Sequence, residues 1–310
     1  MLPQTPQRAQ RPVLTSTDST RRAIEDRPVI GALTMVGALA ILPGMDAIAK
    51  LLSGHLPVLE IVWARYVVYA LLLLPAALRR HGLALFRPRR PLWQLLRGGL
   101  MALSAMMFFS AVARIPLADA MSVFFVYPLL ILVISALFMG EAIGWQRWLL
   151  VLLGFVGAIL VIRPSIHGVS PGVLFALASG TAYGSALVAT RKLASHDPAL
   201  VTATISAVLG AVVFSLLVPF VWKTPDLEDW PLLALIGVIA TAGHFLIIAA
   251  HRMATASQLA PYGYTEIVAA ILFGFIVFGD LPDPIVWLGI AVIVASGIAV
   301  TWSNSRAKAS

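Results

Sequence analysis

Residues 256–278 read ASQLAPYGYTEIVAAILFGFIVF, an apolar stretch in which Glu266 is the only charged side chain. A helix of about 20 apolar residues spans the ~30 Å hydrocarbon core of a bilayer, so this stretch is predicted to cross a membrane. Glu266 is its eleventh residue and falls near the middle of the span. A charge there costs about 2.5–3.5 kcal/mol on insertion scales, so an intramembrane acid is a functional candidate by default.

The whole chain has this apolar character. Of its 310 residues, 60% are apolar and 12% are charged, whereas an average soluble domain is about 45–50% apolar and about 25% charged. This composition excludes a water-soluble protein. The net charge of +8 comes from basic residues between apolar runs, which is typical of membrane orientation signals and not of a nucleic-acid partner. The absence of cysteine excludes disulfides and cysteine-ligated metals.

Polar residues, proline and glycine divide the chain into apolar segments that predict an all-α membrane protein of ten transmembrane helices. They cover about residues 29–52, 57–78, 95–113, 116–138, 145–162, 172–190, 199–222, 231–250, 256–278 and 284–302. Seven of the eight tryptophans fall at predicted span ends, where indole rings favour the headgroup level. Trp63 is the exception.

The distribution of Lys and Arg predicts that both termini are cytoplasmic. Seventeen of the 22 basic residues fall on the N-terminal side of the predicted membrane and four on the other, and cytoplasmic connections carry such an excess. Residues 1–28 lack the short apolar segment of a cleaved signal peptide and are predicted to be a disordered cytoplasmic tail. Residues 303–310 are predicted to be a second cytoplasmic tail.

Residues 29–164 and 171–302 are predicted to be two copies of one five-helix unit. At an offset of roughly 140 residues, the alignment pairs Lys50, Ser53, His55, Pro57, Arg114, Gly140, Glu141 and Gly157 with Lys192, Ser195, His196, Pro198, Arg252, Gly279, Asp280 and Gly297. Because five is odd, the second copy enters the membrane from the opposite side. Inverted repeats place a site near the midplane and support alternating access. Chance matching of small residues between apolar helices is the alternative.

Two stretches of the chain resemble the end of an EamA repeat of the drug/metabolite transporter superfamily. They are residues 140–164, which begin GEAIGW and contain Gly154 and Gly157, and residues 279–297, which begin with Gly and Asp. The resemblance implies a 5+5 inverted repeat around a central cavity, in a membrane of the bacterial inner-membrane type. It also implies export of metabolites such as amino acids, and the YddG-type amino-acid exporters are the most similar members.

Proline interrupts the two spans that correspond in the two halves. Pro261 cannot donate a hydrogen bond to the carbonyl of Ser257, and Pro128 interrupts the earlier span in the same way. Corresponding broken spans are the best sequence indication of a transporter site. The candidate substrate-binding residues beside the two breaks are Met121, Phe124, Tyr127, Tyr262 and Glu266. Glu266 is interpreted as a ligand for a substrate ammonium group or as a proton carrier, and a protonated structural hydrogen-bond donor is the alternative.

Other polar or aromatic residues inside the spans need a partner or a function. Arg65 lies roughly 12 Å from the nearer end of its span, at 1.5 Å per residue, and needs a substrate carboxylate or a structural ion pair. Trp63 lines the predicted cavity or packs between helices. His244 aligns with Met106 and so departs from the repeated scaffold, which favours a role specific to one half. A neutral imidazole bonded to a hydroxyl is the alternative.

Five further residues are weaker candidates. Asp46 and Asp119 lie toward the outer ends of their predicted spans and are interpreted as gate or loop anchors. Ser104 and Tyr183, together with Ser179, are interpreted as cavity-lining residues. Hydroxyl groups are also common where membrane helices pack against each other, which is the structural alternative.

The sequence predicts a transporter and not an enzyme. It contains no HExxH zinc site, no GxGD or GxSG intramembrane protease pattern and no GxxxxGK[ST] nucleotide loop, and no cofactor or metal is predicted. The predicted function is export of small metabolites, above all neutral and aromatic amino acids, by an alternating-access monomer with protons as a further partner. Efflux of drugs or lipophilic cations is the alternative, and a non-transporting scaffold is the alternative from another class.

Overall fold

A computed structural model of the protein describes residues 27–139, 145–162, 169–193, 196–254 and 256–306. All regular secondary structure in these ranges is helical. Seven helices are long and apolar enough to cross a membrane, and three further apolar helices, Leu117–Ile131, Trp148–Ile162 and Pro284–Ala299, are shorter. The prediction of an all-helical membrane protein is confirmed.

Each predicted span falls on one helix or on a consecutive group of helices. The first group comprises α2 (Pro28–Leu52), α3 (Val58–His81), η1 (Gly82–Phe86), α4 (Pro91–Val112), α5 (Leu117–Phe124), α6 (Tyr127–Met139) and α7 (Trp145–Ile162). The second comprises α8 (Pro171–Leu193), α9 (Ala199–Leu217), η2 (Val218–Phe220), α10 (Asp229–Met253), α11 (Ala256–Leu259), η3 (Ala260–Tyr264), α12 (Thr265–Phe273), η4 (Gly274–Phe278) and α13 (Pro284–Arg306). α4 begins four residues earlier than predicted, because proline suits the first turn of a helix.

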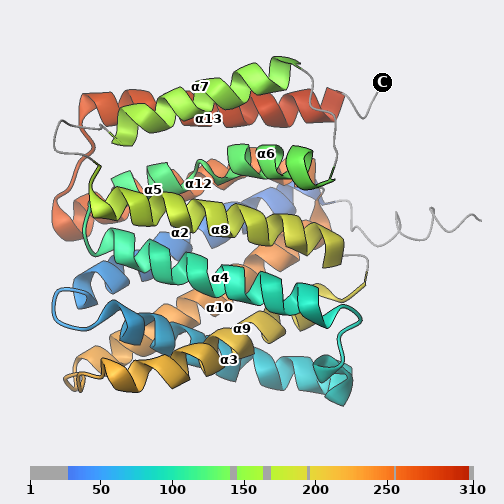
Figure 1. Cartoon of the computed structure of the whole chain (residues 1–310), viewed down its shortest axis with the longest axis vertical. Helices are drawn as coiled ribbons and strands as arrows, with labels where there is room; N and C mark the ends of the chain where they lie inside the picture. The colour runs from blue at the N-terminus through green and yellow to red at the C-terminus, as the bar shows by residue number, and fades with distance from the viewer. Residues whose placement is uncertain (1–26, 140–144, 163–168, 194–195, 255, 307–310) are drawn as a thin grey trace, which may run out of the picture.

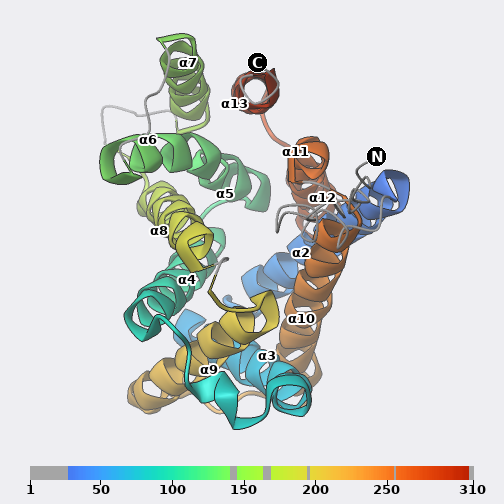
Figure 2. The ribbon, with the colours of Figure 1, turned by 90° about the vertical axis from the view of Figure 1, so that its right-hand side faces the viewer.

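The helices form two arms that rise from a common base. The first arm consists of α4, α8, α5 and α6, and the second of α10, α2, α11 and α12 (Figures 1 and 2). α3 and α9 pack against each other beneath both arms, and α7 pairs with α13 at the opposite edge. Each arm therefore combines helices from both halves of the chain.

Glycines allow the closest helix contacts. A Cβ added to Gly157 of α7 would lie 2.9 Å from the carbonyl oxygen of Gly289 in α13. Within the second arm, a Cβ on Gly243 of α10 would lie 2.5 Å from a methyl group of Leu42 in α2. In a bilayer no hydrophobic effect drives helices together, because lipid tails are as apolar as the side chains. Small residues at these positions let the two backbones approach closely, so that van der Waals packing holds the helices together.

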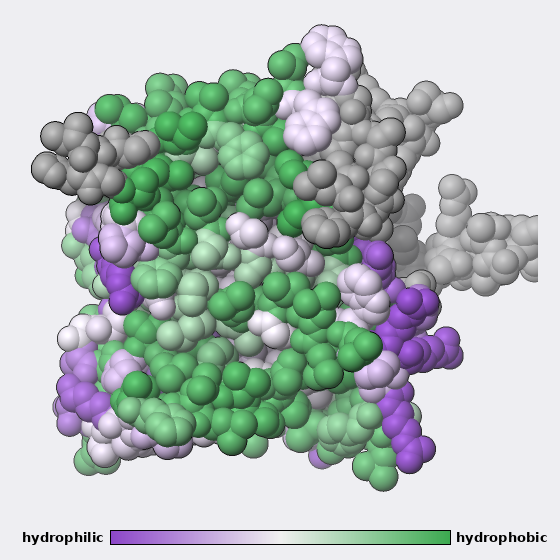
Figure 3. Space-filling view, viewed as in Figure 1, coloured by the Kyte–Doolittle hydropathy of each residue, from purple (hydrophilic) through white to green (hydrophobic). Residues whose placement is uncertain are grey.

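Polar side chains gather at the two ends of the helices. Figure 3 shows an apolar face between purple patches at its left and right edges, so the helices run across an apolar layer. The start of α2 and the end of α13 lie at one end of the bundle, which we call the terminal end, and the loops at residues 53–57 and 113–116 lie at the other, the distal end (Figure 1).

Hydrogen bonds join segments that are far apart in sequence at each end. At the distal end, Nζ of Lys50 lies 2.9 Å from a carboxylate oxygen of Asp280. At the terminal end, the side chain of Gln94 donates to Asp197 over 2.9 Å. The first pair lies within the second arm, and the second joins the first arm to the base. Neither pair joins one arm to the other.

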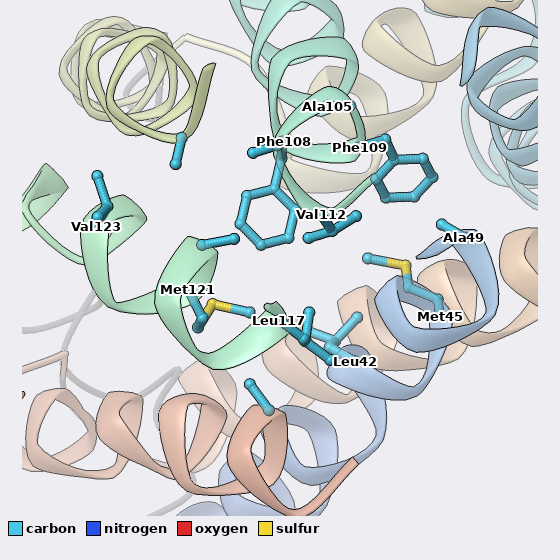
Figure 4. Packing of buried hydrophobic residues seen from close by; sticks show 14 of the residues in the cluster. Leu42, Met45, Ala49, Ala105, Phe108, Phe109, Val112, Leu117, Met121 and Val123 are labelled. Carbon is cyan, nitrogen blue, oxygen red and sulfur yellow. The ribbon is translucent and has the colours of Figure 1, made fainter. Parts of the chain in front are cut away.

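The main contacts between the two arms lie in the distal half of the bundle. There α5 packs on α12 and α2, and α4 also packs on α2. Figure 4 shows the apolar side chains that meet there, including Met45 of α2, Phe109 of α4 and Met121 of α5. Among the described residues, apolar packing is therefore the main contact that joins the arms distally.

Candidate functional site

The first proline break separates α5 from α6 near the middle of the bundle. α5 ends at Phe124, α6 begins at Tyr127, and Pro128 is its second residue. Pro128 has no N–H to donate to the carbonyl of Phe124. That carbonyl lies against Gly180 of α8, where a Cβ would be 2.7 Å from the oxygen. The break thus exists because a proline removes a hydrogen bond and a glycine makes room for the carbonyl left behind.

The second proline break lies opposite the first. α11 ends at Leu259, residues 260–264 form the 3₁₀ turn η3, and α12 begins at Thr265. The rings of Tyr264 in η3 and Phe125 at the first break lie 5.9 Å apart between centroids. Glu266 lies in the first turn of α12, where the positive end of the helix dipole favours a carboxylate. Both predicted interruptions are therefore present, and the two breaks meet.

Tyr264 is the tyrosine of η3 that joins the aromatic rings at the first break. An uninterrupted α-helix would instead place Tyr262 one turn before Glu266 on the same face. A 3₁₀ helix has three residues per turn, and the structure places Tyr264 against Phe125 while Tyr262 is 40% exposed. The contact of Tyr264 with the cluster follows from packing around the 3₁₀ turn, and the role of Tyr262 as a substrate-binding residue stays a prediction.

Six aromatic rings form a cluster around the two breaks. Phe124 is its centre, with ring centroids 5.2 Å from each of Phe108, Tyr127 and Tyr183, and Tyr127 lies edge-to-face 4.9 Å from Tyr183. The members are Phe108, Phe124, Phe125, Tyr127, Tyr183 and Tyr264. Phe124, Tyr127 and Tyr183 were predicted site residues. The other three were missed because their proximity depends on contacts between different spans.

Two carboxyl groups lie inside the second arm. Asp46 of α2 is 2% exposed and its Oδ1 has no hydrogen-bond partner among the described residues. It interacts electrostatically with Glu266 and with Arg65. The sequence favoured a gate or loop anchor for Asp46, but the structure places it inside the bundle with the other ionisable groups.

Arg65 of α3 provides the opposite charge. Its guanidinium lies over the rings of Phe109 and Tyr66, 5.3 and 5.7 Å from their centroids. Among the described residues, no carboxylate lies within 4.0 Å of it. A guanidinium offers five donors and binds a carboxylate in a two-pronged geometry. Arg65 therefore retains donors for a bound anion.

Tyr183 is within electrostatic range of charges of both signs. It interacts electrostatically with Glu266 and with Arg97 and Arg65. Arg97 of α4 was not a sequence candidate, and its guanidinium donates to side chains or carbonyls of α8 and α9. Its partners are Thr190, Thr202 and Ser206. Arg97 is therefore held in place, whereas the guanidinium of Arg65 has no hydrogen-bond partner among the residues that the structure describes.

His244 of α10 lies on the basic side of the interior. Its Nδ1 donates to the carbonyl of Ala240 over 2.6 Å, and its ring is 5.3 Å from that of Tyr69. It interacts electrostatically with Arg65 and Arg97. Because Nδ1 carries the donated proton, Nε2 is left as an acceptor. This partner is a backbone carbonyl and not the hydroxyl considered from the sequence.

The remaining sequence candidates lie away from the charged interior. Ser104 is buried against Ser179, whose hydroxyl donates to the Ser104 carbonyl over 2.8 Å, so this pair joins α4 to α8. Trp63 is half-buried, and its indole N–H donates to Ser215 over 2.9 Å. Met121 is buried among apolar side chains, and Asp119 is half-buried in the first turn of α5. The GEAIG motif at residues 140–144 and residues 163–164 lie outside the described residues.

Apolar helices long enough to cross a membrane, with ionisable and aromatic side chains in their interior, define an integral membrane protein with a candidate binding site. The chain belongs to the EamA-like transporter family, which it matches over residues 29–163 and again over residues 170–302. A solved crystal structure of 24% sequence identity has a TM-score of 0.59 and covers 91% of this chain and 99% of that chain, which shows a shared fold.

Several curated relatives align along most of the chain. The pseudopaline exporter CntI of Pseudomonas aeruginosa is 31% identical over 87% of this chain and 95% of its own length. The riboflavin transporter of Vibrio cholerae is 28% identical over 92% and 98%. The S-adenosylmethionine uptake transporter of Rickettsia bellii is 26% identical over 84% and 90%. The protein is thus a membrane transporter of small metabolites and not an enzyme, as the sequence predicted.

Proposed function

We propose that this transporter exports small zwitterionic metabolites with an apolar or aromatic side group, neutral and aromatic amino acids among them, by alternating access. The observation that carries the proposal is the separation of charge inside the bundle. Asp46 and Glu266 lie on the second arm, Arg65 lies on the base, and Tyr183 interacts with groups of both signs.

The charges suit a zwitterion because each end of the substrate meets an opposite charge. An ammonium group is placed by Glu266, and a carboxylate is placed by the free donors of Arg65. The rings of Phe124, Tyr127 and Tyr183 offer an apolar surface for the side group. Aromatic pairs of this kind contribute about 0.5–1.5 kcal/mol beyond the area that they bury.

The proposed transport cycle uses the repeated architecture. We expect ten spans as two inverted five-helix units, residues 29–164 and 171–302, with cytoplasmic tails at residues 1–28 and 303–310. Because the arms join through apolar packing at the distal end, their separation there exposes the interior to the distal side. The protein is expected to act as a monomer in a bacterial-type inner membrane, and Glu266 is the candidate for proton exchange.

Counterflow in liposomes that contain only this protein tests the function. Liposomes loaded with unlabelled phenylalanine, methionine or threonine are expected to accumulate labelled phenylalanine. Liposomes that contain the protein but no unlabelled amino acid are not. Phenylpropionate and phenethylamine, which each lack one charge, should compete weakly. No accumulation of any amino acid would overturn the proposal.

Efflux of lipophilic cations is the second candidate, because two interior carboxyl groups, Asp46 and Glu266, lie near aromatic rings that attract cations. In the same assay, strong competition by phenethylamine with none by phenylpropionate would favour this candidate over amino acids. Equal competition by phenylalanine and phenethylamine would show that Arg65 does not bind the substrate carboxylate.

A further inference from the structure

The connection between α3 and α4 presents a basic surface at the terminal end. Residues 79–92 contain five arginines and no acidic residue, and all five arginines are exposed. The arginines are Arg79, Arg80, Arg87, Arg89 and Arg90. Three large apolar side chains stand among them, with Leu83 and Leu92 each 78% exposed and Phe86 57% exposed. In Figure 3, hydrophilic residues (purple) form patches at the right edge, at the border of the apolar face.

This connection is anchored to the helical bundle. Gly82 ends α3 with φ +57, a conformation that glycine adopts without strain, and lets the chain turn into η1. Leu85 is 1% exposed and packs with Ala77 and Val201. The backbone N–H of Arg89 donates to Asp197 over 3.3 Å. Because only the backbone of Arg89 is used, its guanidinium is available to a partner.

The matching connection at the distal end also exposes apolar side chains but has the opposite charge. Between α9 and α10, Phe220 at the end of η2 is 84% exposed, and Leu227 in the loop that follows is 89% exposed. Residues 218–230 contain one lysine and three acidic residues. Exposed apolar side chains are therefore common to both connections, and the five arginines distinguish the connection at the terminal end.

We propose that residues 79–92 form a binding surface for anionic phospholipids. The guanidinium groups bind headgroup phosphates, for which their planar donor geometry is suited. Leu83, Phe86 and Leu92 enter the acyl-chain boundary beside the headgroups, as apolar side chains of interfacial segments do. A soluble acidic partner would match the arginines but would leave these three apolar side chains in water.

Lipid titration of the full-length protein in neutral detergent tests this surface. Phosphatidylglycerol should raise the midpoint of thermal unfolding and be retained in native mass spectra, whereas phosphatidylcholine with the same acyl chains should do neither. Each arginine near an anionic surface contributes about 1 kcal/mol, so each substitution should lower the ratio of bound phosphatidylglycerol to phosphatidylcholine about fivefold. The triple variant R87Q/R89Q/R90Q should therefore lose nearly all of the preference.

Two variants and one competitor make the test specific. Arg252→Gln removes an exposed arginine from the end of α10 and should leave the preference unchanged, while L83S/F86S should weaken retention of phosphatidylglycerol. Each variant is first shown to unfold at the wild-type temperature without added lipid. Equal retention of both lipids, or full retention by the triple variant, would overturn the proposal. Stabilisation by inorganic phosphate or RNA in place of phosphatidylglycerol would overturn it as well.

Discussion

The two spans are both interrupted by a proline, but the side chains beside the two interruptions differ in chemistry. In the first span, the break between α5 and α6 is surrounded by aromatic rings such as Phe124 and Tyr127. In the second, η3 brings Tyr264 to that cluster and starts a new helix whose first turn carries Glu266. The comparison teaches that the break is part of the scaffold, whereas the residues beside it give the interior its polarity.

The largest expected effect comes from removing the charge at the second break. Glu266→Gln keeps the shape of the side chain and removes the partner of a substrate ammonium, and losing one member of a buried charge pair costs about 2–5 kcal/mol. Phenylalanine affinity in counterflow should fall about 30-fold or more. Glu228→Gln, on an exposed loop, is the matched control. Unchanged transport by the Glu266 variant would remove this residue from the site.

The second prediction concerns Arg65, which lies on α3 in the base and interacts electrostatically with Tyr183 of the aromatic cluster. Arg65→Gln removes the donors for the substrate carboxylate and should lower phenylalanine affinity about tenfold or more, because bonds to charged groups contribute about 1.5–3 kcal/mol. Arg65→Lys should recover part of the loss, since lysine keeps the charge without the planar fork. Binding of phenethylamine should stay at the wild-type level in both variants. A parallel loss for phenethylamine would indicate a structural role.

A third prediction separates the packing of the two breaks. Gly180→Ala places a Cβ 2.7 Å from the Phe124 carbonyl, and crowding of this kind typically costs about 1–3 kcal/mol. Gly263, in the second break, has no neighbour within 4 Å of an added Cβ. Gly263→Ala should leave the thermal unfolding midpoint unchanged or raise it, whereas Gly180→Ala should lower it. Equal midpoints would show that the first break tolerates crowding.

The smallest expected effect concerns the contact between the breaks. Phe125→Leu removes the ring that faces Tyr264, and the aromatic contribution lost is about 0.5–1.5 kcal/mol. Thermal unfolding should begin at a lower temperature, with a modest change in transport rate. Phe275→Leu, at an outward-facing position of η4 that is 51% exposed, should behave as the wild type. If both variants are equally stable, the contact between the Phe125 and Tyr264 rings does not contribute to the stability of the fold.

Much of the candidate site could be predicted from local sequence, and the rest depended on contacts between spans. Glu266 and Arg65 stand out as charges in apolar segments, whatever their neighbours are. Asp46 looked like a loop anchor because its distance from the span end was the only local information. Arg97 was missed because its role follows from Thr190 and Ser206 on other helices.

The sequence by itself determined that this protein is an all-helical membrane protein and where two of its spans break. Both properties are local, since hydropathy acts on each segment and a proline removes its own hydrogen bond. Only the tertiary structure decided that the two breaks face each other, that Tyr264 and not Tyr262 joins the aromatic cluster, and that Asp46 interacts with Glu266. Those relations depend on the pitch of one 3₁₀ turn and on packing between distant helices, which hydropathy does not encode.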